Sequence, residues 1–253
     1  MEASESRRTP WSAGEAAAAY ERGRPGYAEA TVDFVLEPVR DRPGPRGLDV
    51  GAGTGKLTRQ LAARGVDMVA VEPSQAMRRW LRHAVRSATV LSGVAEDLPL
   101  PGDSVDVVVA GQAFHWFDRD RALAEVARVL RPGGVLGVLY NSRDDAVAWV
   151  RELSDVIGET DDHVSTRPRG TPALPAAFGP VEVAEAMHEQ ELDVAGLVDL
   201  VASRSYVIRM PPADRAALLG RVAELARTHP QLVGRQHFSM PYLTRAYRSV
   251  LRS

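Results

Sequence analysis

Residues 48–55, LDVGAGTG, combine an acidic residue with three closely spaced glycines. The apolar residues at the start predict the end of a buried strand, and the glycines predict a tight turn that brings backbone close to a ligand. Residues 56–64 then show the apolar spacing of a helix. Backbone N–H groups at the start of a helix attract polar or anionic ligands, so the stretch predicts a binding turn.

Two common nucleotide-binding turns do not fit this spacing. A P-loop needs glycine at position 50 and Ser or Thr at position 57, where the chain has Val50 and Leu57. A dinucleotide fingerprint places its third glycine at position 56, which is Lys56. The spacing GxGxG behind Asp49 remains, and a glycine turn without any ligand is the alternative.

This spacing resembles the first motif of class I methyltransferases that use S-adenosylmethionine (SAM). The resemblance implies SAM as cofactor and S-adenosylhomocysteine (SAH) as product. It assigns cofactor contacts to the motif residues Asp49, Gly51, Ala52, Gly53, Thr54 and Gly55.

Glu72 and Pro73 follow a predicted strand over residues 66–71. A carboxylate about 20 residues beyond such a turn suits two ribose hydroxyls, because it accepts both hydrogen bonds. We therefore expect Glu72 and Pro73 to contact the ribose of SAM. The alternative is a surface glutamate before a helix, where acidic residues are common.

Residues 95–99, AEDLP, resemble the adenine-binding loop of the same family. The resemblance assigns a backbone contact to Ala95 and an acidic contact to Glu96. Many relatives carry Asp at the position of Val94, so the acidic role here falls on Glu96 or Asp97.

The N-terminal residues Tyr20, Arg24 and Tyr27 match a Y…RP.Y stretch of these relatives. There the stretch resembles a lid over the methionine end of the cofactor, with the arginine facing its carboxylate. The same pattern also fits an amphipathic helix whose aromatic residues pack inward and whose arginine is solvated.

Residues 110–118 follow a predicted buried strand over residues 105–109, and ligands of such sheets bind at the carboxyl ends of strands. The string QAFHWFD resembles a small-molecule subgroup that includes trans-aconitate methyltransferases. We expect Gly111 and Gln112 to contact the cofactor and Gln112 to orient the acceptor. His115 is the candidate base, since its unperturbed pKa lies near neutrality. A packed or solvated histidine is the alternative.

The order of predicted elements favours a doubly wound α/β fold: a seven-stranded, mostly parallel sheet with helices on both faces and a helical cap. In the family that the chain resembles, the last strand inserts antiparallel beside the fifth. Strands are predicted over residues 48–50, 66–71, 89–91, 105–109, 135–140, 181–188 and 239–251. Helices are predicted over residues 13–20, 28–39, 56–64, 74–85, 118–130, 144–158, 192–204 and 212–227.

We expect one domain over residues 1–253, with lid helices in 1–40, a SAM-binding core in 41–140, and a substrate cap with the final strands in 141–253. The cap region carries four basic residues that suit a carboxylate or phosphate, although arginines are frequent throughout the chain. These residues are Arg143, His163, Arg167 and Arg169.

The amino-acid composition argues against several classes of binding partner. A net charge of −2 gives no basic footprint for nucleic acid or a membrane surface, and the absence of cysteine removes disulfides and the usual zinc sites. No apolar run reaches the roughly 18 residues of a membrane span. We expect a cytoplasmic protein, monomeric or homodimeric, without a metal. Lys56 is the only lysine, which indicates a GC-rich bacterial gene.

The sequence thus predicts transfer of a methyl group from SAM to a small-molecule acceptor through oxygen, nitrogen or a carboxylate. A carboxylate or an unsaturated carbon could accept the methyl group without a base, so the need for a base stays open. Two alternatives remain: a SAM-binding protein without transferase activity, and an NAD-dependent oxidoreductase, which the glycine spacing disfavours.

Overall fold

The computed structural model describes residues 14–158 and 174–252, so His163, Arg167 and Arg169 lie outside the described residues. The chain divides into two compact units. The sheet unit consists of Gly26–Asn141, Pro168–Ala186 and Thr244–Ser253. The helical unit consists of Met1–Pro25, Ser142–Arg167 and Met187–Leu243.

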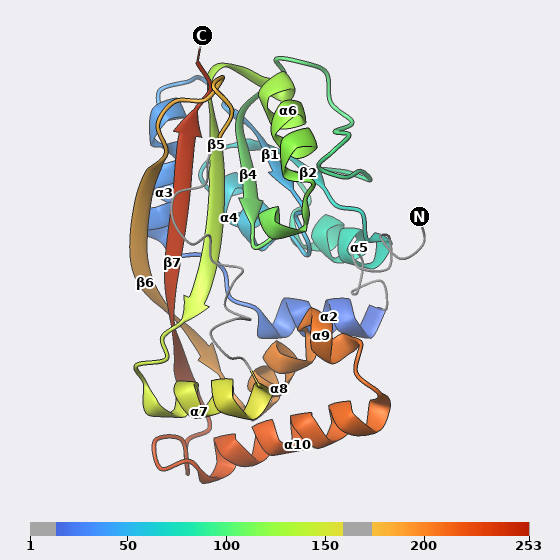
Figure 1. The fold of residues 1–253 in the computed structure, drawn as a ribbon, viewed down its shortest axis with the longest axis vertical. Coiled ribbons are helices and arrows are strands. Elements are labelled where there is room, and N and C mark those ends of the chain that lie inside the picture. The colour runs from blue at the N-terminus through green and yellow to red at the C-terminus, as the bar shows by residue number, and fades with distance from the viewer. Residues whose placement is uncertain (1–13, 159–173, 253) are drawn as a thin grey trace. The chain divides into compact units, whose positions relative to one another are not determined.

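In the described residues, seven strands form one sheet in the order β3-β2-β1-β4-β5-β7-β6 (Figure 1). Neighbouring strands from β3 to β5 pair in parallel. This order confirms the predicted doubly wound, mostly parallel sheet. The strands are β1 (Arg46–Val50), β2 (Asp67–Val71), β3 (Thr89–Leu91), β4 (Val105–Gly111), β5 (Leu130–Arg143), β6 (Glu182–Leu192) and β7 (Phe238–Val250).

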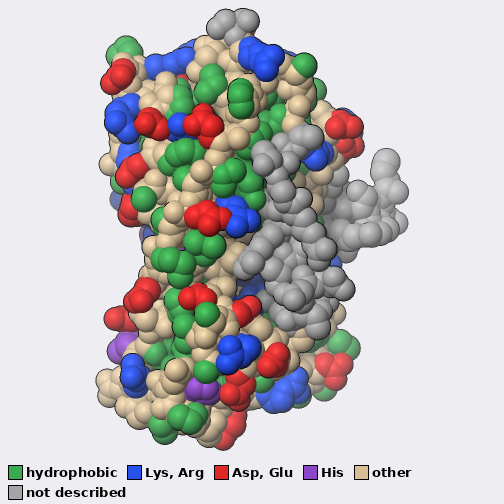
Figure 2. All heavy atoms as spheres, turned by 60° about the vertical axis from the view of Figure 1, so that its left-hand side comes forward, with side chains coloured by type: hydrophobic (Ala, Val, Ile, Leu, Met, Phe, Trp, Pro, Cys, Tyr) green, Lys and Arg blue, Asp and Glu red, His purple; other side chains and the backbone are tan. Residues whose placement is uncertain are grey.

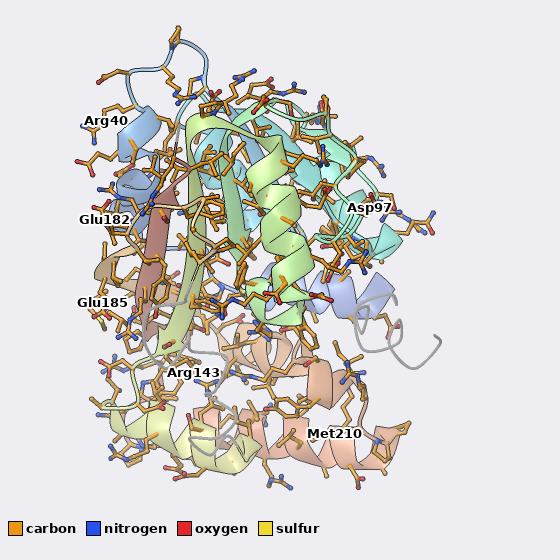
Figure 3. All side chains as sticks on the ribbon, turned by 45° about the horizontal axis from the view of Figure 1, so that its top comes forward. Arg40, Asp97, Arg143, Glu182, Glu185 and Met210 are labelled. Carbon is orange, nitrogen blue, oxygen red and sulfur yellow. The ribbon has the colours of Figure 1, made fainter. Side chains whose placement is uncertain are left out.

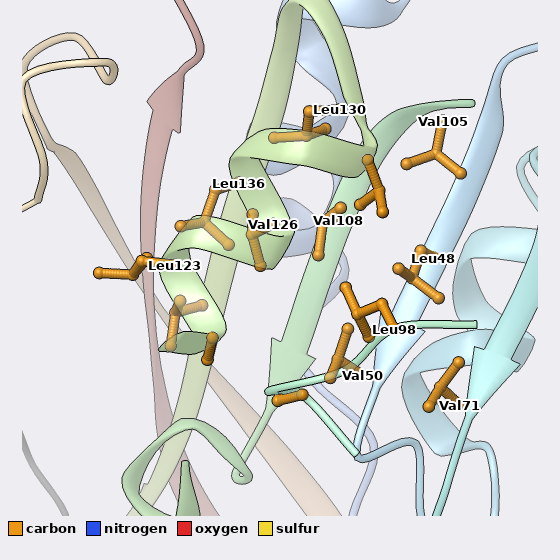
Figure 4. Close-up of a cluster of buried hydrophobic side chains, with 14 of the residues drawn as sticks. Leu48, Val50, Val71, Leu98, Val105, Val108, Leu123, Val126, Leu130 and Leu136 are labelled. Atoms are coloured by element: carbon orange, nitrogen blue, oxygen red, sulfur yellow. The ribbon is translucent and has the colours of Figure 1, made fainter. Parts of the chain in front are cut away.

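The central strands are apolar on both faces because helices cover both. On β4, Val108 packs with Leu48 and with Val126 of helix α6 (Arg119–Val129) in one cluster (Figure 4). Its neighbours Val107 and Val109 belong to a second cluster that contains side chains of helices α3 (Glu29–Leu36) and α4 (Lys56–Ala62). Successive side chains of a strand point to opposite faces of the sheet. The two clusters therefore lie on opposite faces, and each face is covered by its own layer of helices.

Strand β7 runs antiparallel to β5. Gly133 N–H donates to the carbonyl of Leu251 at 3.0 Å, and Leu251 N–H donates to the carbonyl of Gly134 at 2.8 Å. These bonds lie just beyond the end of β7, and the arrows of β5 and β7 point in opposite directions in Figure 1, as in an antiparallel pair. The prediction that the last strand inserts antiparallel beside the fifth is confirmed.

Two predicted helix caps also form. The Ser74 hydroxyl accepts from Met77 N–H at 3.4 Å, and the Asp118 carboxylate accepts from Arg121 N–H at 3.4 Å. These side chains satisfy backbone donors that a helix start leaves without partners. The helices of the sheet unit are α3 (Glu29–Leu36), η2 (Glu37–Val39), α4 (Lys56–Ala62), α5 (Gln75–Ala84), η3 (Phe114–Trp116) and α6 (Arg119–Val129).

The helical unit has its own core, which includes Trp149, Leu197 and Val222. Gly23 ends α2 where the backbone of Leu200 passes, and an added Cβ would overlap that backbone. The glycine therefore permits close contact between α2 and α8. The helices are α2 (Gly14–Gly23), α7 (Ala148–Ile157), α8 (Val194–Ala202), α9 (Ser205–Ile208) and α10 (Pro212–Thr228).

Some boundaries differ from the predicted ones. Strand β5 begins at Leu130 rather than residue 135, because Leu130 pairs with Val105 across a register shift. Strand β6 continues to Leu192 rather than 188, with exposed and partly buried residues alternating as on a sheet edge. The next helix begins at Val194 because the Asp193 carboxylate caps it, accepting from Gly196 N–H at 2.7 Å.

Candidate functional site

The predicted glycine turn joins β1 to α4 in the sheet unit. Gly51, Gly53 and Gly55 have φ of 68°, 58° and 89°, a left-handed conformation that other residues adopt at a cost. Gly51 N–H donates to the carbonyl of Val71 at 2.8 Å, which ties the turn to the end of β2. Conformation therefore requires glycine at all three positions.

Packing adds a second reason for two of these glycines. A Cβ at Gly51 would lie 2.8 Å from Cβ of Ala113, and one at Gly55 would overlap the side chain of Leu81. The turn thus has no room for larger residues at either end.

Glu72 directly follows strand β2, and its side chain is hydrogen-bonded to the glycine turn. Its Oε2 accepts from Gly53 N–H at 2.9 Å, and its Oε1 accepts from Ser74 N–H at 2.8 Å. Burial raises the pKa of Glu72, although the two backbone donors and Arg78 oppose that rise. Each carboxylate oxygen can accept more than one hydrogen bond, so a ribose contact remains compatible with this geometry. Sequence reasoning missed the bond to Gly53.

Asp49 is buried beneath the turn. Its Oδ2 accepts from the Thr58 hydroxyl at 2.6 Å, while its Oδ1 has no hydrogen-bond partner among the described residues. Burial raises the pKa of Asp49 to about 7. A buried acceptor without a partner is unfavourable by itself and suits a ligand donor such as the ammonium of SAM. The hydroxyl of Thr54, also buried in the turn, likewise lacks a partner in the described chain.

In the predicted adenine loop, Ala95 and Glu96 are both buried. Glu96 Oε1 accepts from Asp118 N–H at 2.7 Å, so this carboxylate ties the loop to the start of α6. Asp97, in contrast, is exposed (Figure 3). The contact of this loop with adenine stays a prediction.

Gly111 ends β4 directly against Tyr27. A Cβ at Gly111 would overlap the Tyr27 hydroxyl, and the tyrosine is buried. Gln60 fixes the tyrosine backbone, because Tyr27 N–H donates to Gln60 Oε1 at 2.9 Å and Gln60 Nε2 donates to the Tyr27 carbonyl at 2.7 Å. The sequence placed Tyr27 in the lid stretch but did not predict this contact.

Gln112 adopts an uncommon backbone conformation, with φ of 53°. Its N–H donates to the carbonyl of Leu139 and its Nε2 donates to the carbonyl of Asn141, both at 2.9 Å. A non-glycine residue held in this region stores strain, which is typical of functional sites. Its amide nitrogen is engaged with β5, which leaves the amide oxygen for a ligand.

His115 lies in η3 with part of its side chain exposed. Its ring centre is 5.0 Å from that of Trp116 and 6.4 Å from that of Tyr140. Desolvation lowers the pKa of His115 to about 4. The imidazole is therefore neutral at pH 7, and its role as a base stays a prediction.

Tyr20 and Arg24 belong to the helical unit and contact each other there, with the guanidinium 5.5 Å from the tyrosine ring centre. Arg24 Nε also donates to the Ser203 hydroxyl at 2.8 Å. Arg24 is therefore not simply a solvated surface residue. The contact of both residues with the cofactor stays a prediction.

Residues 14–158 and 174–252 contain no group of three or more His, Asp or Glu side chains that could hold a metal ion. In the same residues, no helix is long and apolar enough to cross a membrane. The face drawn in Figure 2 shows basic and acidic side chains interspersed. Arg248 of β7, for example, pairs with Glu182 of β6 at 2.7 Å.

Comparisons with known proteins match the residues that form this site. A family model described as a methyltransferase domain matches residues 48–138, which span the glycine turn, Glu72, the adenine loop and His115. An uncharacterized methyltransferase of Mycobacterium tuberculosis is 46% identical over 94% of this chain and 95% of its own length. An uncharacterized methyltransferase-like protein of Schizosaccharomyces pombe is 30% identical over 91% of both chains.

Solved structures share the fold. A protein of Anaeromyxobacter dehalogenans assigned as a type II methyltransferase is 27% identical, with a TM-score of 0.63 over 90% of this chain and 97% of that one. The full-length similarity to the mycobacterial relative shows the family. The chain therefore belongs to the methyltransferases, and its cofactor is S-adenosylmethionine.

Proposed function

We propose that the protein transfers the methyl group of SAM to a small-molecule acceptor through oxygen, nitrogen or a carboxylate. The observation that carries this proposal is the buried pair of carboxylates at the glycine turn. Glu72 fixes the turn through Gly53, and Asp49 keeps one oxygen without a partner among the described residues. Both lie at the carboxyl ends of adjacent parallel strands, where ligands of doubly wound sheets bind.

The residues present fit the cofactor. Glu72 and Pro73 would contact the ribose, Asp49 would accept from the ammonium group, and Ala95 and Glu96 would contact adenine. The turn residues Gly51, Ala52, Gly53, Thr54 and Gly55 would approach the cofactor with their backbone. When bound, SAM supplies a methyl group on a sulfonium, which is already an activated leaving group.

Residues after β4 would then serve the acceptor. Gly111, the last residue of β4, would contact the cofactor through its backbone, and the amide oxygen of Gln112 would orient an acceptor or the methionine end. His115 would accept the proton of a hydroxyl or protonated amine, for which a neutral imidazole is the correct state. For a carboxylate acceptor the protein would need only to position it and exclude water.

Tyr20 and Arg24 are proposed to cover the methionine end of SAM, with Arg24 facing its carboxylate. Support comes from their contact with each other, which presents a cation beside an aromatic ring. The string QAFHWFD favours the small-molecule subgroup that includes trans-aconitate methyltransferases.

We further propose a cytoplasmic bacterial enzyme with one methyltransferase domain over residues 1–253, acting as a monomer or homodimer. Nucleic acid is not proposed as a substrate, since the net charge of −2 offers little attraction for phosphates.

Calorimetry with SAM and NAD side by side tests the cofactor. Saturable SAM binding without NAD binding is the expected result. SAH release is then measured with a panel of carboxylic acids, amines and phenols, and turnover on at least one is expected. SAM binding without turnover on any of them would favour a SAM-binding protein that is not a transferase.

A further inference from the structure

Gln112 directly follows strand β4, at the edge of the sheet where ligands of doubly wound folds bind. Its φ of 53° is an unfavourable conformation for glutamine. Among the described residues, Asp103 is the one other non-glycine residue with a positive φ, and it lies in an exposed turn. Glycine adopts this conformation without strain, so the presence of glutamine indicates that its side chain has a function.

Two hydrogen bonds fix the orientation of Gln112. Its backbone N–H donates to the carbonyl of Leu139, and its Nε2 donates to the carbonyl of Asn141, both at 2.9 Å. A carbonyl oxygen only accepts, so the nitrogen of the amide must face Asn141. The amide oxygen, Oε1, therefore points away from the Asn141 carbonyl.

Asn141 is itself held in place by other parts of the sheet unit. Its Nδ2 donates to the carbonyl of Gly26 at 2.7 Å, and its Oδ1 accepts from the Thr244 hydroxyl at 2.6 Å. The Thr244 hydroxyl also accepts from Ala28 N–H at 3.0 Å. With the Asn141 carbonyl held in this way, turning the Gln112 amide over would set two acceptors against each other. Gln112 therefore presents an acceptor and not a donor.

The oxygen of the Gln112 amide is open to a ligand. The side chain is half-buried, and Oε1 accepts no hydrogen bond from residues 14–158 and 174–252. An amide oxygen attracts O–H and N–H groups and repels the oxygens of a carboxylate. The ligand group that contacts it must therefore carry a hydrogen atom that it can donate.

The rest of the segment after β4 offers little to a negative charge. Residues 111–117, GQAFHWF, contain no lysine or arginine, and the imidazole of His115 is neutral at pH 7. Carboxylates and phosphates are bound most strongly by guanidinium or ammonium groups. An accepting oxygen and a neutral base on one segment suit a group that loses a proton, as a hydroxyl or an amine does.

We propose that Gln112 Oε1 accepts a hydrogen bond from the O–H or N–H group that receives the methyl group. The methyl acceptor is then a hydroxyl or an amine and not a carboxylate. This inference rests on the proposed function and narrows it. The acceptor atom bonds to the methyl carbon while the bond from that carbon to sulfur breaks, and the electron pair of that bond stays on sulfur in SAH. The acceptor proton passes to a base, for which His115 is the candidate.

The first test measures SAH release by the full-length protein with SAM and three matched series of acceptors at pH 8. The series share their carbon skeletons and differ in the reacting group, beginning with phenol, benzylamine and benzoate. Turnover on a hydroxyl or an amine, and on no carboxylate, is expected. Turnover on a carboxylate would overturn the inference and leave the proposed function standing, whereas SAM binding without turnover on any series would overturn both.

The second test measures binding instead of activity. Calorimetry gives the affinity of the acceptor found in the first test for the protein saturated with SAH. Gln112→Met keeps the length of the side chain and removes the accepting oxygen. It is expected to weaken acceptor binding roughly 2- to 12-fold for a hydroxyl and roughly 10- to 150-fold for a protonated amine, the ranges for neutral and charged hydrogen bonds. Gln236→Met is the matched control, since Gln236 is an exposed glutamine shortly before β7. Equal affinity in wild type and in Gln112→Met would overturn the inference.

Gln112→Gly keeps the test decisive if the methionine variant does not fold. Glycine adopts a φ of 53° without strain, so this variant is expected to fold and to show the same loss of acceptor affinity. SAM affinity is expected to be unchanged in both variants, because any contact of the Gln112 backbone with SAM remains. Weaker SAM binding with unchanged binding of 5′-methylthioadenosine, which lacks the methionine end, would assign Gln112 to that end of the cofactor and overturn the inference.

Discussion

Glu72 and Gly53 are joined by a hydrogen bond of 2.9 Å from the glycine N–H to the carboxylate. The bond links the end of β2 to the middle of the glycine turn, so one side chain both shapes the turn and offers acceptors to a ligand.

Glu72→Ala is therefore expected to weaken SAM binding by about 1.5–3 kcal/mol, or roughly 10- to 150-fold in Kd. Calorimetry with SAM measures the change. Asp67→Ala is the control, because Asp67 is exposed at the opposite end of β2. Unchanged SAM affinity in the Glu72 variant would remove this residue from the ribose site.

Asp49 predicts a pH dependence of stability. Its pKa is raised to about 7, so the folded state holds its proton more tightly than the unfolded state does. This contribution is present at low pH and is lost as pH rises from about 4 to about 7. Asp49→Asn should therefore stabilise the ligand-free protein at pH 8 more than at pH 5, as measured by thermal unfolding.

The same carboxyl should make SAM binding depend on pH. The ammonium of SAM favours the ionised carboxylate, so affinity should rise between pH 6 and pH 8 in wild type. That rise should be absent in Asp49→Asn. A wild-type affinity that stays constant over this range would contradict a contact between Asp49 and the ammonium.

His115→Ala should lower kcat about 10²- to 10⁴-fold if the acceptor must lose a proton, which is the usual share of a general base. Because desolvation lowers the pKa of His115 to about 4, we expect the rising limb of the wild-type pH profile near pH 4. SAM affinity should not change. His83→Ala, at an exposed histidine of α5, is the control.

Gly111→Ala should destabilise the protein by about 1–3 kcal/mol, the usual cost of overpacking. Its Cβ would overlap the Tyr27 hydroxyl, so adding Tyr27→Phe should restore part of that loss. Denaturant unfolding of both single variants and the double variant gives the coupling. Simple additivity would show that the two residues do not contact each other.

Asp106 should stabilise the sheet unit at neutral pH. Burial raises its pKa, but Arg46 N–H at 2.8 Å, Arg42 at 2.6 Å and Arg131 at 2.8 Å outweigh burial and lower it overall. Asp106→Ala should cost about 1.5–3 kcal/mol at pH 7, the range for hydrogen bonds to a charged group, because Arg42 and Arg131 are partly exposed and water can hydrate them in the variant.

The lowered pKa of Asp106 determines how its contribution to the free energy of unfolding changes with pH. The contribution is present above the unfolded pKa of about 4 and is lost as pH falls through the folded value. The difference between wild type and Asp106→Ala should therefore shrink below pH 4. Asp120→Ala, at an exposed aspartate of α6, should show little difference at either pH.

Features encoded by neighbouring residues could be predicted from the sequence. The glycine turn needs only its own spacing, and the caps at Ser74 and Asp118 need only the next three residues. The predicted sheet follows from strands whose apolar residues are nearly continuous, as in β4.

Features that depend on residues far apart in sequence were not predictable. The bond between Glu72 and Gly53 needs the register of two strands, and the low pKa of His115 needs the rings that pack around it. The hydrogen bond from Arg24 to the Ser203 hydroxyl likewise joins residues 179 positions apart in the sequence.

Strand β6 lies last in the sheet order and exposes Val183 and Met187, with 46% and 56% of their surface accessible. Exposed apolar edges favour pairing between molecules and aggregation. Apart from His188, every titratable side chain in β6 is a glutamate. Arg248 and Arg245 of β7 pair with Glu182 and Glu185, and Glu189 and Glu191 would add like charge to a contact between two such edges. The folded protein should therefore associate less readily at neutral pH than in acid.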